Sequence, residues 1–249
     1  MNIATIRASR LPLIEVARAL TPPAIWSALY RCLVVRDIPD ADQYKPHFSP
    51  WRAPWFQELY KSVAPNTVVS PDRCWTLWLG VAQALNVEGD LAEMGVFQGG
   101  TARLILEAMG SQDDKSLLLF DSFEGMKSVS VENDRHGRGD FGDTSLEHVM
   151  DVVAHDPRVR AFKGWIPATF AGLGDRTFAF VHVDLDLYQG ILDTLDFVYP
   201  RLSQGGVIVF DDYGFASCPG ARRAVDEFFA DKKEKPLALS TSQAIVHKL

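Results

Sequence analysis

Short apolar runs alternate with amphipathic stretches from about residue 72 to the end of the chain. Apolar runs of about 4–8 residues between turn residues are typical of buried strands, whereas apolar positions three or four apart are typical of helices. The predicted strands are 89–96, 116–121, 159–163, 177–184 and 206–211, with two shorter ones around Leu237 and at 244–247. The predicted helices are 73–85, 101–109, 145–154, 189–199 and 219–230, with a helical turn near 167–170.

This alternation predicts an α/β fold in which helices cover both faces of a parallel sheet. Right-handed crossovers then give a doubly wound, Rossmann-like sheet, in which ligands bind beyond the carboxyl ends of the strands. Residues 1–71 differ, because they are rich in proline and tryptophan and lack strand alternation. We therefore predict a mostly helical N-terminal extension over 1–71, which forms part of the acceptor side, a lid or an oligomer contact, and a catalytic domain over 72–249.

The composition narrows the class of protein. The chain has 249 residues, 47% of them hydrophobic, and a net charge of −7, which is adequate for a sizeable core and argues against nucleic-acid binding. Its three cysteines, Cys32, Cys74 and Cys218, form no C-x-x-C pair. This pattern argues against a disulfide framework and against a zinc site, and it favours a reducing, cytoplasmic location.

The N-terminal region has no clear targeting signal. Charged residues and prolines interrupt the apolar stretch 11–20, and no apolar run reaches the length of about 20 residues needed to span a membrane. The segment 25–36 is amphipathic, so it fits either a membrane surface or a helix docked on its own domain or on a twin subunit. We favour the docked helix, and we expect a homo-oligomer that binds a small-molecule or glycosidic substrate.

A glycine-rich turn follows the first predicted strand. Glu93 occupies the first glycine position of the dinucleotide motif G-x-G-x-x-G, and a carboxylate there would repel a pyrophosphate. It suits a cationic ligand without phosphate, such as S-adenosylmethionine. We predict cofactor contacts from Glu93, Gly95, Val96, Gly99 and Thr101; the alternative is a tight structural turn.

The ends of the second and third strands supply further candidates. Asp121 follows Gly99 by 121 − 99 = 22 residues, near the spacing of about 20 at which an acidic residue binds ribose hydroxyls. Ser122 and Phe123 come next, and Gly164-Trp165 ends the third strand, where an aromatic ring suits adenine. The alternatives are a turn aspartate and a core tryptophan.

Four carboxylates follow the fourth and fifth strands. Asp184, Asp211 and Asp212 would meet where neighbouring parallel strands end, and oxygen ligands of this kind suit Mg²⁺. Asp184 is also counted among the cofactor contacts. Asp186 lies just past the strand, where a general base would accept a hydroxyl proton. His182 is either a partner of this cluster or a buried core residue. The alternative for the cluster is a set of solvated turn aspartates capping two helices.

These residues lie within motifs that resemble the macrocin O-methyltransferase family of sugar O-methyltransferases. The matching segments are GDLAEMGVFQGGTA, LFDSFEGM, FKGWIPATF, HVDLDLYQGILDTLDFVYPRLSQGGVIVFDDYG and PGARRAVDEFF. The resemblance implies a class I methyltransferase fold with S-adenosylmethionine and Mg²⁺. It implies metal ligation by Asp184, Asp211 and Asp212, a general base at Asp186, and cofactor contacts at Glu93, Gly95, Asp121 and Ser122. Family members act on deoxysugars of antibiotics, often as dimers or larger assemblies.

Three other functions remain open. Asp184-Leu185-Asp186 is also the D-x-D of a glycosyltransferase, although Glu93 and Asp121 argue against a nucleotide sugar. A catechol-type methyltransferase would share the metal chemistry, and an inactive protein would share the fold. The loop 127–144 is either a mobile lid over the acceptor or a surface insertion.

Overall fold

Seven strands form one sheet at the centre of this computed structural model, which describes residues 25, 49–126, 132 and 134–249. The strands are β1 (Asp90–Met94), β2 (Leu117–Asp121), β3 (Val159–Lys163), β4 (Phe178–Val183), β5 (Leu202–Phe210), β6 (Leu237–Ala238) and β7 (Ala244–His247). Their order is β3-β2-β1-β4-β5-β7-β6. Strands β1 to β5 are parallel, and β7 runs antiparallel to both β5 and β6.

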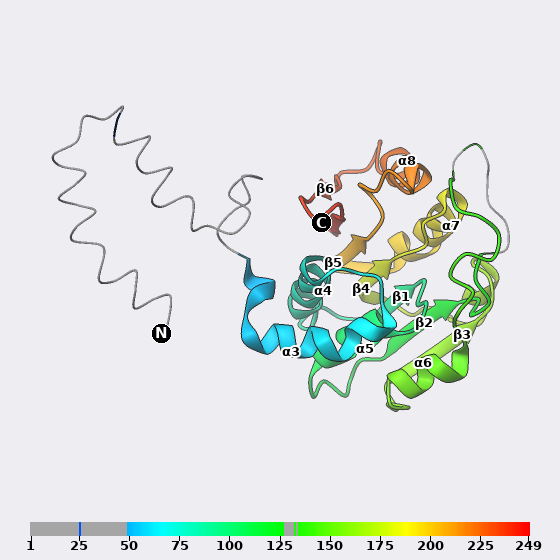
Figure 1. Ribbon diagram of the computed structural model, residues 1–249. Coiled ribbons are helices and arrows are strands. Elements are labelled where there is room, and N and C mark those ends of the chain that lie inside the picture. Colours follow the sequence, from blue (N-terminus) through cyan, green and yellow to red (C-terminus); the bar gives the residue numbers. More distant parts are fainter. Residues whose placement is uncertain (1–24, 26–48, 127–131, 133) are drawn as a thin grey trace. The chain divides into compact units, whose positions relative to one another are not determined.

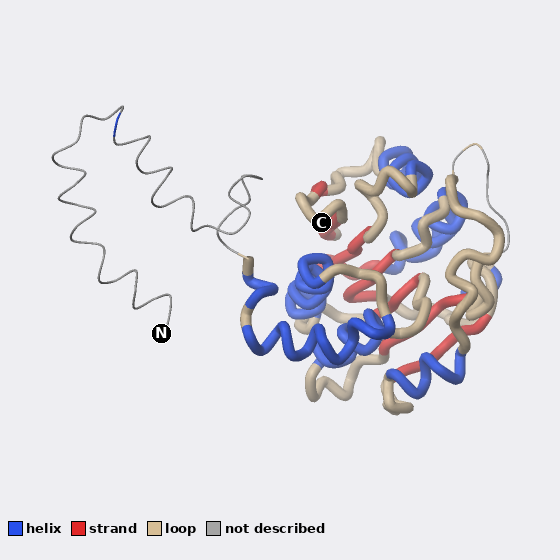
Figure 2. The backbone as a smooth tube through the Cα atoms, viewed as in Figure 1, coloured by secondary structure: helices blue, strands red, loops and turns tan. Residues whose placement is uncertain are grey.

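Helices alternate with the strands and flank the sheet (Figure 2). The α-helices are α3 (Pro54–Val63), α4 (Pro71–Ala84), α5 (Gly100–Met109), α6 (Leu146–Val152), α7 (Tyr188–Val198) and α8 (Pro219–Phe228). Short 3-10 turns are η3 (Pro50–Arg52), η4 (Ala64–Asn66), η5 (Ala168–Phe170) and η6 (Tyr199–Arg201). The Rossmann-like fold predicted from the sequence is confirmed.

The predicted elements are all present, and the largest difference is the start of β5. The apolar pattern placed that start at residue 206, but the strand begins at Leu202. Residues 203–205 are polar or glycine and largely exposed, so they carry no apolar pattern. Leu202 itself pairs with Phe178, and the register shifts before Phe180 pairs with Val207.

Helices flank the sheet (Figure 1), and the sheet separates two apolar layers of buried side chains. Alternate residues of each strand point to opposite faces, as Leu91 and Ala92 show by belonging to different layers. Helices α3, α4 and α5 pack on one face, and η5, α7 and α8 pack on the other. Burial of the strands on both faces explains their near-continuous apolar sequences.

Residues Pro50–Leu249 form one compact unit. Phe56 and Val63 of α3 are fully buried in the layer formed with α4 and α5, so residues 50–71 of the predicted extension pack on this unit. The rest of that extension, including nearly all of the amphipathic segment 25–36, lies outside the described residues. The homo-oligomer and the cytoplasmic location stay predictions. Among the described residues, no helix has the length and apolar character required to cross a bilayer.

The order of the strands brings β1 beside β4, where the chain changes direction across the sheet. Gly95 follows β1 with a φ of +85°, and a Cβ atom built on it would collide with the carbonyl oxygen of Asp184. Only glycine tolerates both this conformation and this approach. The turn after β1 and the turn after β4 are therefore in direct backbone contact.

Candidate active site

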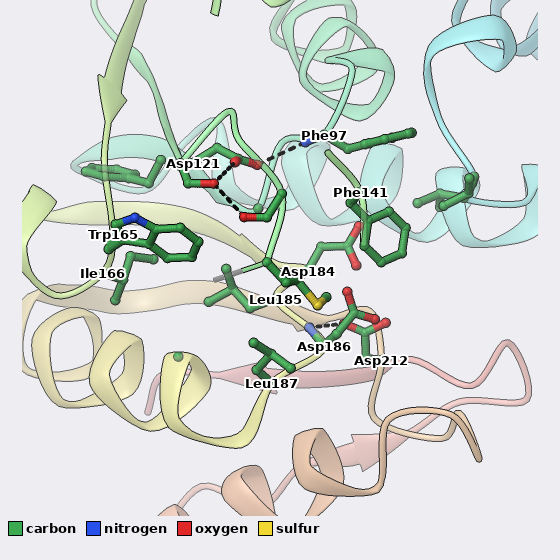
Figure 3. A pocket seen from close by; sticks show the side chains of 18 of the residues that line it. Phe97, Asp121, Phe141, Trp165, Ile166, Asp184, Leu185, Asp186, Leu187 and Asp212 are labelled. Atoms are coloured by element: carbon green, nitrogen blue, oxygen red, sulfur yellow. Dashed lines mark hydrogen bonds between the residues drawn. The ribbon is translucent and has the colours of Figure 1, made fainter. Parts of the chain in front are cut away.

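A pocket opens over the carboxyl ends of the parallel strands (Figure 3). Counting its open mouth, it encloses about 1010 Å³. Two groups of residues line it. The first, which we call the glycine-loop side, follows β1, β2 and β3. The second, which we call the acidic side, follows β4 and β5. Trp165 lies at one end of the pocket, and Asp186 and Asp212 lie at the other (Figure 3).

Most of the predicted site residues meet in this pocket. It is lined by the predicted residues Gly95, Asp121, Ser122, Gly164, Trp165, Asp184, Asp186 and Asp212. The other predicted residues, Glu93, Val96, Gly99, Thr101, Phe123 and Asp211, are not among the lining residues of the described chain. Sequence reasoning missed several apolar lining residues, namely Val68, Val69, Phe97, Met126, Phe141, Ile166, Leu185 and Leu187.

Asp121 anchors the glycine-rich turn. Its Oδ2 accepts hydrogen bonds from the backbone N–H groups of Val96 at 2.7 Å and Phe97 at 3.1 Å. Its Oδ1 accepts one from the N–H of Phe123 at 2.7 Å. The carboxylate therefore holds together the turns after β1 and β2, and Oδ1 keeps accepting capacity toward the pocket. Val96 and Phe123 contribute to the site through these backbone groups.

Gly99 and Thr101 shape the start of α5 and do not line the pocket. Gly99 is the N-cap residue with a φ of +88°, and a Cβ atom there would lie 3.2 Å from Val149. Thr101 is 3% exposed. Direct contact of these two residues with a cofactor stays a prediction. In the structure, they form the buried first turn of α5.

Glu93 and His182 form a buried pair. Both side chains are fully buried, and His182 Nδ1 lies 2.8 Å from Glu93 Oε1. Burial lowers the pKa of His182, but the interactions with Asp211 and Glu93 outweigh it and raise that pKa to about 10. Glu93 Oε2 has no hydrogen-bond partner among the described residues. His182 is thus both a core residue and a link between Glu93 and the acidic side.

Asp184, Asp211 and Asp212 converge as predicted. Each offers an oxygen atom, and these atoms lie within 4.8 Å of one another. Burial raises the pKa of Asp184 well above its usual range, and the charge of Asp211 raises it further. Burial also raises the pKa of Asp212 strongly, with added repulsion from Asp184. Crowded carboxylates of this kind, of which Asp211 and Asp212 are buried, are the donor set that a hard divalent cation prefers.

Asp211 differs from its two neighbours because it already has partners. Arg73 forms an ion pair with Oδ2, and Gln243 Nε2 donates to Oδ1 at 2.7 Å. His182 Nε2 lies 3.6 Å from the same Oδ1. Burial raises the pKa of Asp211, but His182 and Arg73 outweigh it, so that the pKa is lowered overall. Sequence analysis gave no sign of Arg73 or Gln243, because both are distant from Asp211 along the chain.

Asp186 stands between the acidic side and a loop. Its φ is +58°, a left-handed conformation that costs a non-glycine residue about 1–2 kcal/mol. Its N–H donates to Asp212 Oδ2 at 3.0 Å, which helps to hold this conformation (Figure 3). Burial raises its pKa, and the hydrogen bond from Cys218 opposes this. Backbone strain of this kind often accompanies functional residues.

The described part of the predicted lid contacts the site. Residues 127–131 and 133 lie outside the described residues. Asp134 Oδ1 accepts a hydrogen bond of 3.0 Å from the N–H of Tyr188 at the start of α7. Phe141 lines the pocket and packs edge-on against Phe97, with ring centroids 5.5 Å apart. Phe141 therefore contributes to the lining of the pocket, and motion of the loop that carries it stays a prediction.

Comparisons with known proteins give consistent results. The family model described as macrocin-O-methyltransferase (TylF) matches residues 76–244. The chain is 35% identical to demethyldecarbamoylnovobiocin O-methyltransferase of Streptomyces niveus over 58% of this chain and 60% of that protein. It is 33% identical to mycinamicin III 3''-O-methyltransferase of Micromonospora griseorubida over 69% of this chain and 72% of that protein. The match thus spans less than two thirds of the Streptomyces protein.

Solved structures show the same fold. The O-methyltransferase NovP superimposes with a TM-score of 0.63 at 27% identity, covering 89% of this chain and 99% of that one. The calicheamicin methyltransferase CalS11 superimposes with a TM-score of 0.63 at 19% identity, covering 78% of this chain and 93% of that one. The second likeness concerns the fold alone.

Proposed function

Because this chain belongs to the macrocin O-methyltransferase family, we propose that it transfers a methyl group from S-adenosylmethionine to a hydroxyl group of a sugar with the help of Mg²⁺. One observation carries the proposal. Asp186 lies beside a cluster of three carboxylates, in a pocket that is also lined by Gly95 of the glycine-rich turn and by Trp165 at its other end. This arrangement brings together groups suited to bind a methyl donor and to remove a proton from an acceptor.

The glycine-loop side suits the methyl donor. Gly95 has no side chain, so a ligand can approach the backbone of this turn closely. Ser122 and Asp121 offer polar atoms for ribose hydroxyls, and Trp165 offers a ring for adenine. S-adenosylmethionine, when bound, supplies a methyl group on a positively charged sulfur. The role of these residues is to fix that group toward the acidic side.

The acidic side suits Mg²⁺. The residues that would hold the ion are Asp184, Asp211 and Asp212, and the raised pKa values of Asp184 and Asp212 show how poorly their charges are offset by the protein. Arg73 and His182 offset mainly the charge of Asp211. The ion, when bound, supplies positive charge that favours a deprotonated acceptor.

Asp186 is the proposed general base. Its side chain is 15% exposed and lines the pocket, so an acceptor hydroxyl can reach it. Burial raises the pKa of this carboxyl and brings it closer to neutral pH, which makes it a stronger proton acceptor. The N–H bond to Asp212 fixes the backbone that carries it.

The sugar acceptor is inferred from relatives. The names of two similar proteins specify O-methylation of novobiocin and mycinamicin intermediates, and a third names a rhamnosyl tetracenomycin. All three are natural products, and a sugar on such a product or on a surface glycan is the acceptor that we propose. The aromatic lining by Phe97 and Phe141 leaves a catechol as the alternative for the test.

Calorimetric titration is the first experiment. S-adenosylmethionine is titrated into the full chain with Mg²⁺ present, with NAD and UDP-glucose as controls. We expect saturable binding of the methyl donor alone. Binding of UDP-glucose instead would support a glycosyltransferase, and no binding of any of the three would support an inactive protein.

An acceptor screen then tests the substrate class. Rhamnosylated and other deoxysugar compounds are incubated in parallel with catechols, and methylated products are detected by mass spectrometry. We expect methylation of sugars that stops when Mg²⁺ is removed by a chelator. Methylation of catechols, with no methylation of the sugars, would overturn the sugar proposal. Unchanged activity with chelator would overturn the proposed requirement for Mg²⁺.

A further inference from the structure

Three potential metal ligands meet at Asp186, and two of them, His136 and Cys218, are not part of the three-carboxylate cluster. They are His136 of the loop, Asp186 after β4, and Cys218 at the start of α8. Cys218 Sγ lies 3.1 Å from Asp186 Oδ1 and 3.5 Å from His136 Nε2, and His136 Nε2 lies 3.3 Å from Asp186 Oδ1. The three atoms thus form a nearly equilateral triangle of one sulfur, one nitrogen and one oxygen.

The size of this triangle matches tetrahedral zinc. Typical bonds of about 2.3 Å to sulfur and about 2.0–2.1 Å to nitrogen and oxygen imply separations of about 3.3–3.6 Å between neighbouring ligand atoms. Two of the observed separations fall in this range, and the third is shorter by a few tenths of an ångström. A small movement of Asp186 or Cys218 would complete the geometry.

Nδ1 of His136, which is not part of the triangle, already has a hydrogen-bond partner in Asp140. Nδ1 lies 3.2 Å from Asp140 Oδ2, and the same oxygen accepts a hydrogen bond of 2.9 Å from the N–H of Gly137. Zinc-binding histidines commonly donate their second N–H to a carboxylate, which fixes the ring and directs the other nitrogen to the metal. In the tautomer that donates Nδ1–H to Asp140, Nε2 is an acceptor.

Hydrogen bonding alone satisfies the triangle poorly. In that tautomer, Nε2 and Asp186 Oδ1 are both acceptors, and the Cys218 thiol has a single hydrogen to share between them. A cation placed among the three atoms satisfies all of them at once. The acidic side adds further negative charge nearby, which favours any cation at this position.

We propose that His136, Asp186 and Cys218 form a zinc-binding site, separate from the oxygen cluster of Asp184, Asp211 and Asp212. Binding forms an Sγ–Zn²⁺ bond, breaks the S–H bond and releases that proton to solvent. Of the three ligands, Asp186 lines the pocket, so an ion can reach this carboxylate from there. The sequence argued against zinc because it has no C-x-x-C pair, but the fold collects the ligands from three separate segments.

The two sites differ in the ions they prefer. Sulfur and imidazole ligands favour Zn²⁺, whereas a set of carboxylate oxygens favours Mg²⁺. A zinc ion bound here would occupy Asp186 and prevent it from accepting a proton. This inhibition rests on the proposed function, whereas zinc binding itself does not.

Optical titration with Co²⁺ tests the site directly. Co²⁺ replaces Zn²⁺ in such sites, and a cobalt–thiolate bond gives a strong near-ultraviolet band together with the visible bands of a tetrahedral ion. The full chain is titrated with excess Mg²⁺ present to fill the oxygen cluster. We expect both sets of bands to saturate at one Co²⁺ per chain and to disappear when Zn²⁺ is added.

Matched variants assign the ligands. Cys218→Ser and His136→Asn should each abolish the thiolate band or weaken binding about 100-fold or more, and Asp140→Asn should weaken it about 10–100-fold. Cys32→Ser is the control and should leave the spectrum unchanged. His136 lies on a loop, so its variant keeps the test valid if Cys218→Ser fails to fold.

The same titration can overturn the proposal. Absence of a thiolate band in the wild-type chain, or an unchanged band in Cys218→Ser or His136→Asn, would show that these residues do not hold the metal. Because methyl transfer is not measured, failure here is distinct from failure of the methyltransferase proposal.

Discussion

The two sides of the pocket satisfy their carboxylates in opposite ways. On the glycine-loop side, Asp121 accepts three backbone N–H groups and Glu93 pairs with His182, so the protein itself supplies most of the partners. On the acidic side, burial and mutual repulsion raise the pKa values of Asp184 and Asp212. Most carboxylate oxygens of the first side have partners within the protein, whereas the protein offsets the charges of Asp184 and Asp212 on the second side poorly. Substitutions on the two sides should therefore respond differently to Mg²⁺.

The largest effect is expected on the acidic side, from Asp186→Asn. Turnover should fall about 100-fold or more, because the amide cannot accept the hydroxyl proton. Binding of S-adenosylmethionine and Mg²⁺, measured by calorimetry, should change little, since Asp186 contacts the cluster through its backbone N–H. Equal turnover in the wild type and the variant would remove Asp186 from the role of base.

Asp212→Asn should raise the stability relative to the wild type without Mg²⁺ and lower it relative to the wild type with Mg²⁺. Without metal, the variant should have a higher Tm than the wild type, because one poorly compensated buried charge is gone. The amide oxygen can still accept the N–H of Asp186. With Mg²⁺, the wild type should gain more stability than the variant, because the variant has lost one of the three proposed carboxylate ligands. Thermal melts with chelator and with Mg²⁺ measure the Tm difference between variant and wild type in each condition. The same difference in both conditions would contradict the inference that the protein offsets the charges of the acidic side poorly.

Asp121→Asn is the matched change on the glycine-loop side. An amide N–H₂ placed against the N–H groups of Val96, Phe97 or Phe123 leaves at least one buried donor unpaired, at a cost of about 1–3 kcal/mol. Urea unfolding should show the same loss with chelator and with Mg²⁺. If Mg²⁺ restored the free energy of unfolding of Asp121→Asn, the charges of the two sides would have to influence each other.

The smallest effect is expected from Trp165→Ala. Stacking on an aromatic ring contributes about 0.5–1.5 kcal/mol, so the Kd for S-adenosylmethionine should rise by up to about tenfold. Trp165→Phe should restore most of the affinity and serves as the control. Calorimetry with Mg²⁺ held constant makes the measurement, and unchanged affinity in Trp165→Ala would favour a structural role for this ring.

The sequence revealed the position of these groups better than their partners. Apolar strands with acidic residues directly after them place Asp121, Asp184 and Asp212 at one edge of a parallel sheet, because strand direction and spacing are local properties. That Asp121 holds backbone N–H groups depends on the path of a loop. Such a path is not visible in residue types.

Contacts between distant segments were missed for the same reason. Arg73 lies 138 residues from Asp211, and Gln243 reaches it from the opposite direction along the chain. Cys218 and His136 are 82 residues apart and sit in unlike elements. Each residue alone is ordinary, and only the folded arrangement of α4, α8 and the loop after β2 gives them a common neighbour.

The contact between Gly95 and the carbonyl of Asp184 constrains how this chain can be recombined with its relatives. Residues 134–144, of which Phe141 lines the pocket, are the segment to exchange between homologues in search of new acceptors. A recombination point between β1 and β4 instead takes the two contacting turns from different parents, so their backbones no longer come from one matched pair. Chimeras that inherit both turns from one parent should yield folded, donor-binding libraries, and those that divide them should yield few.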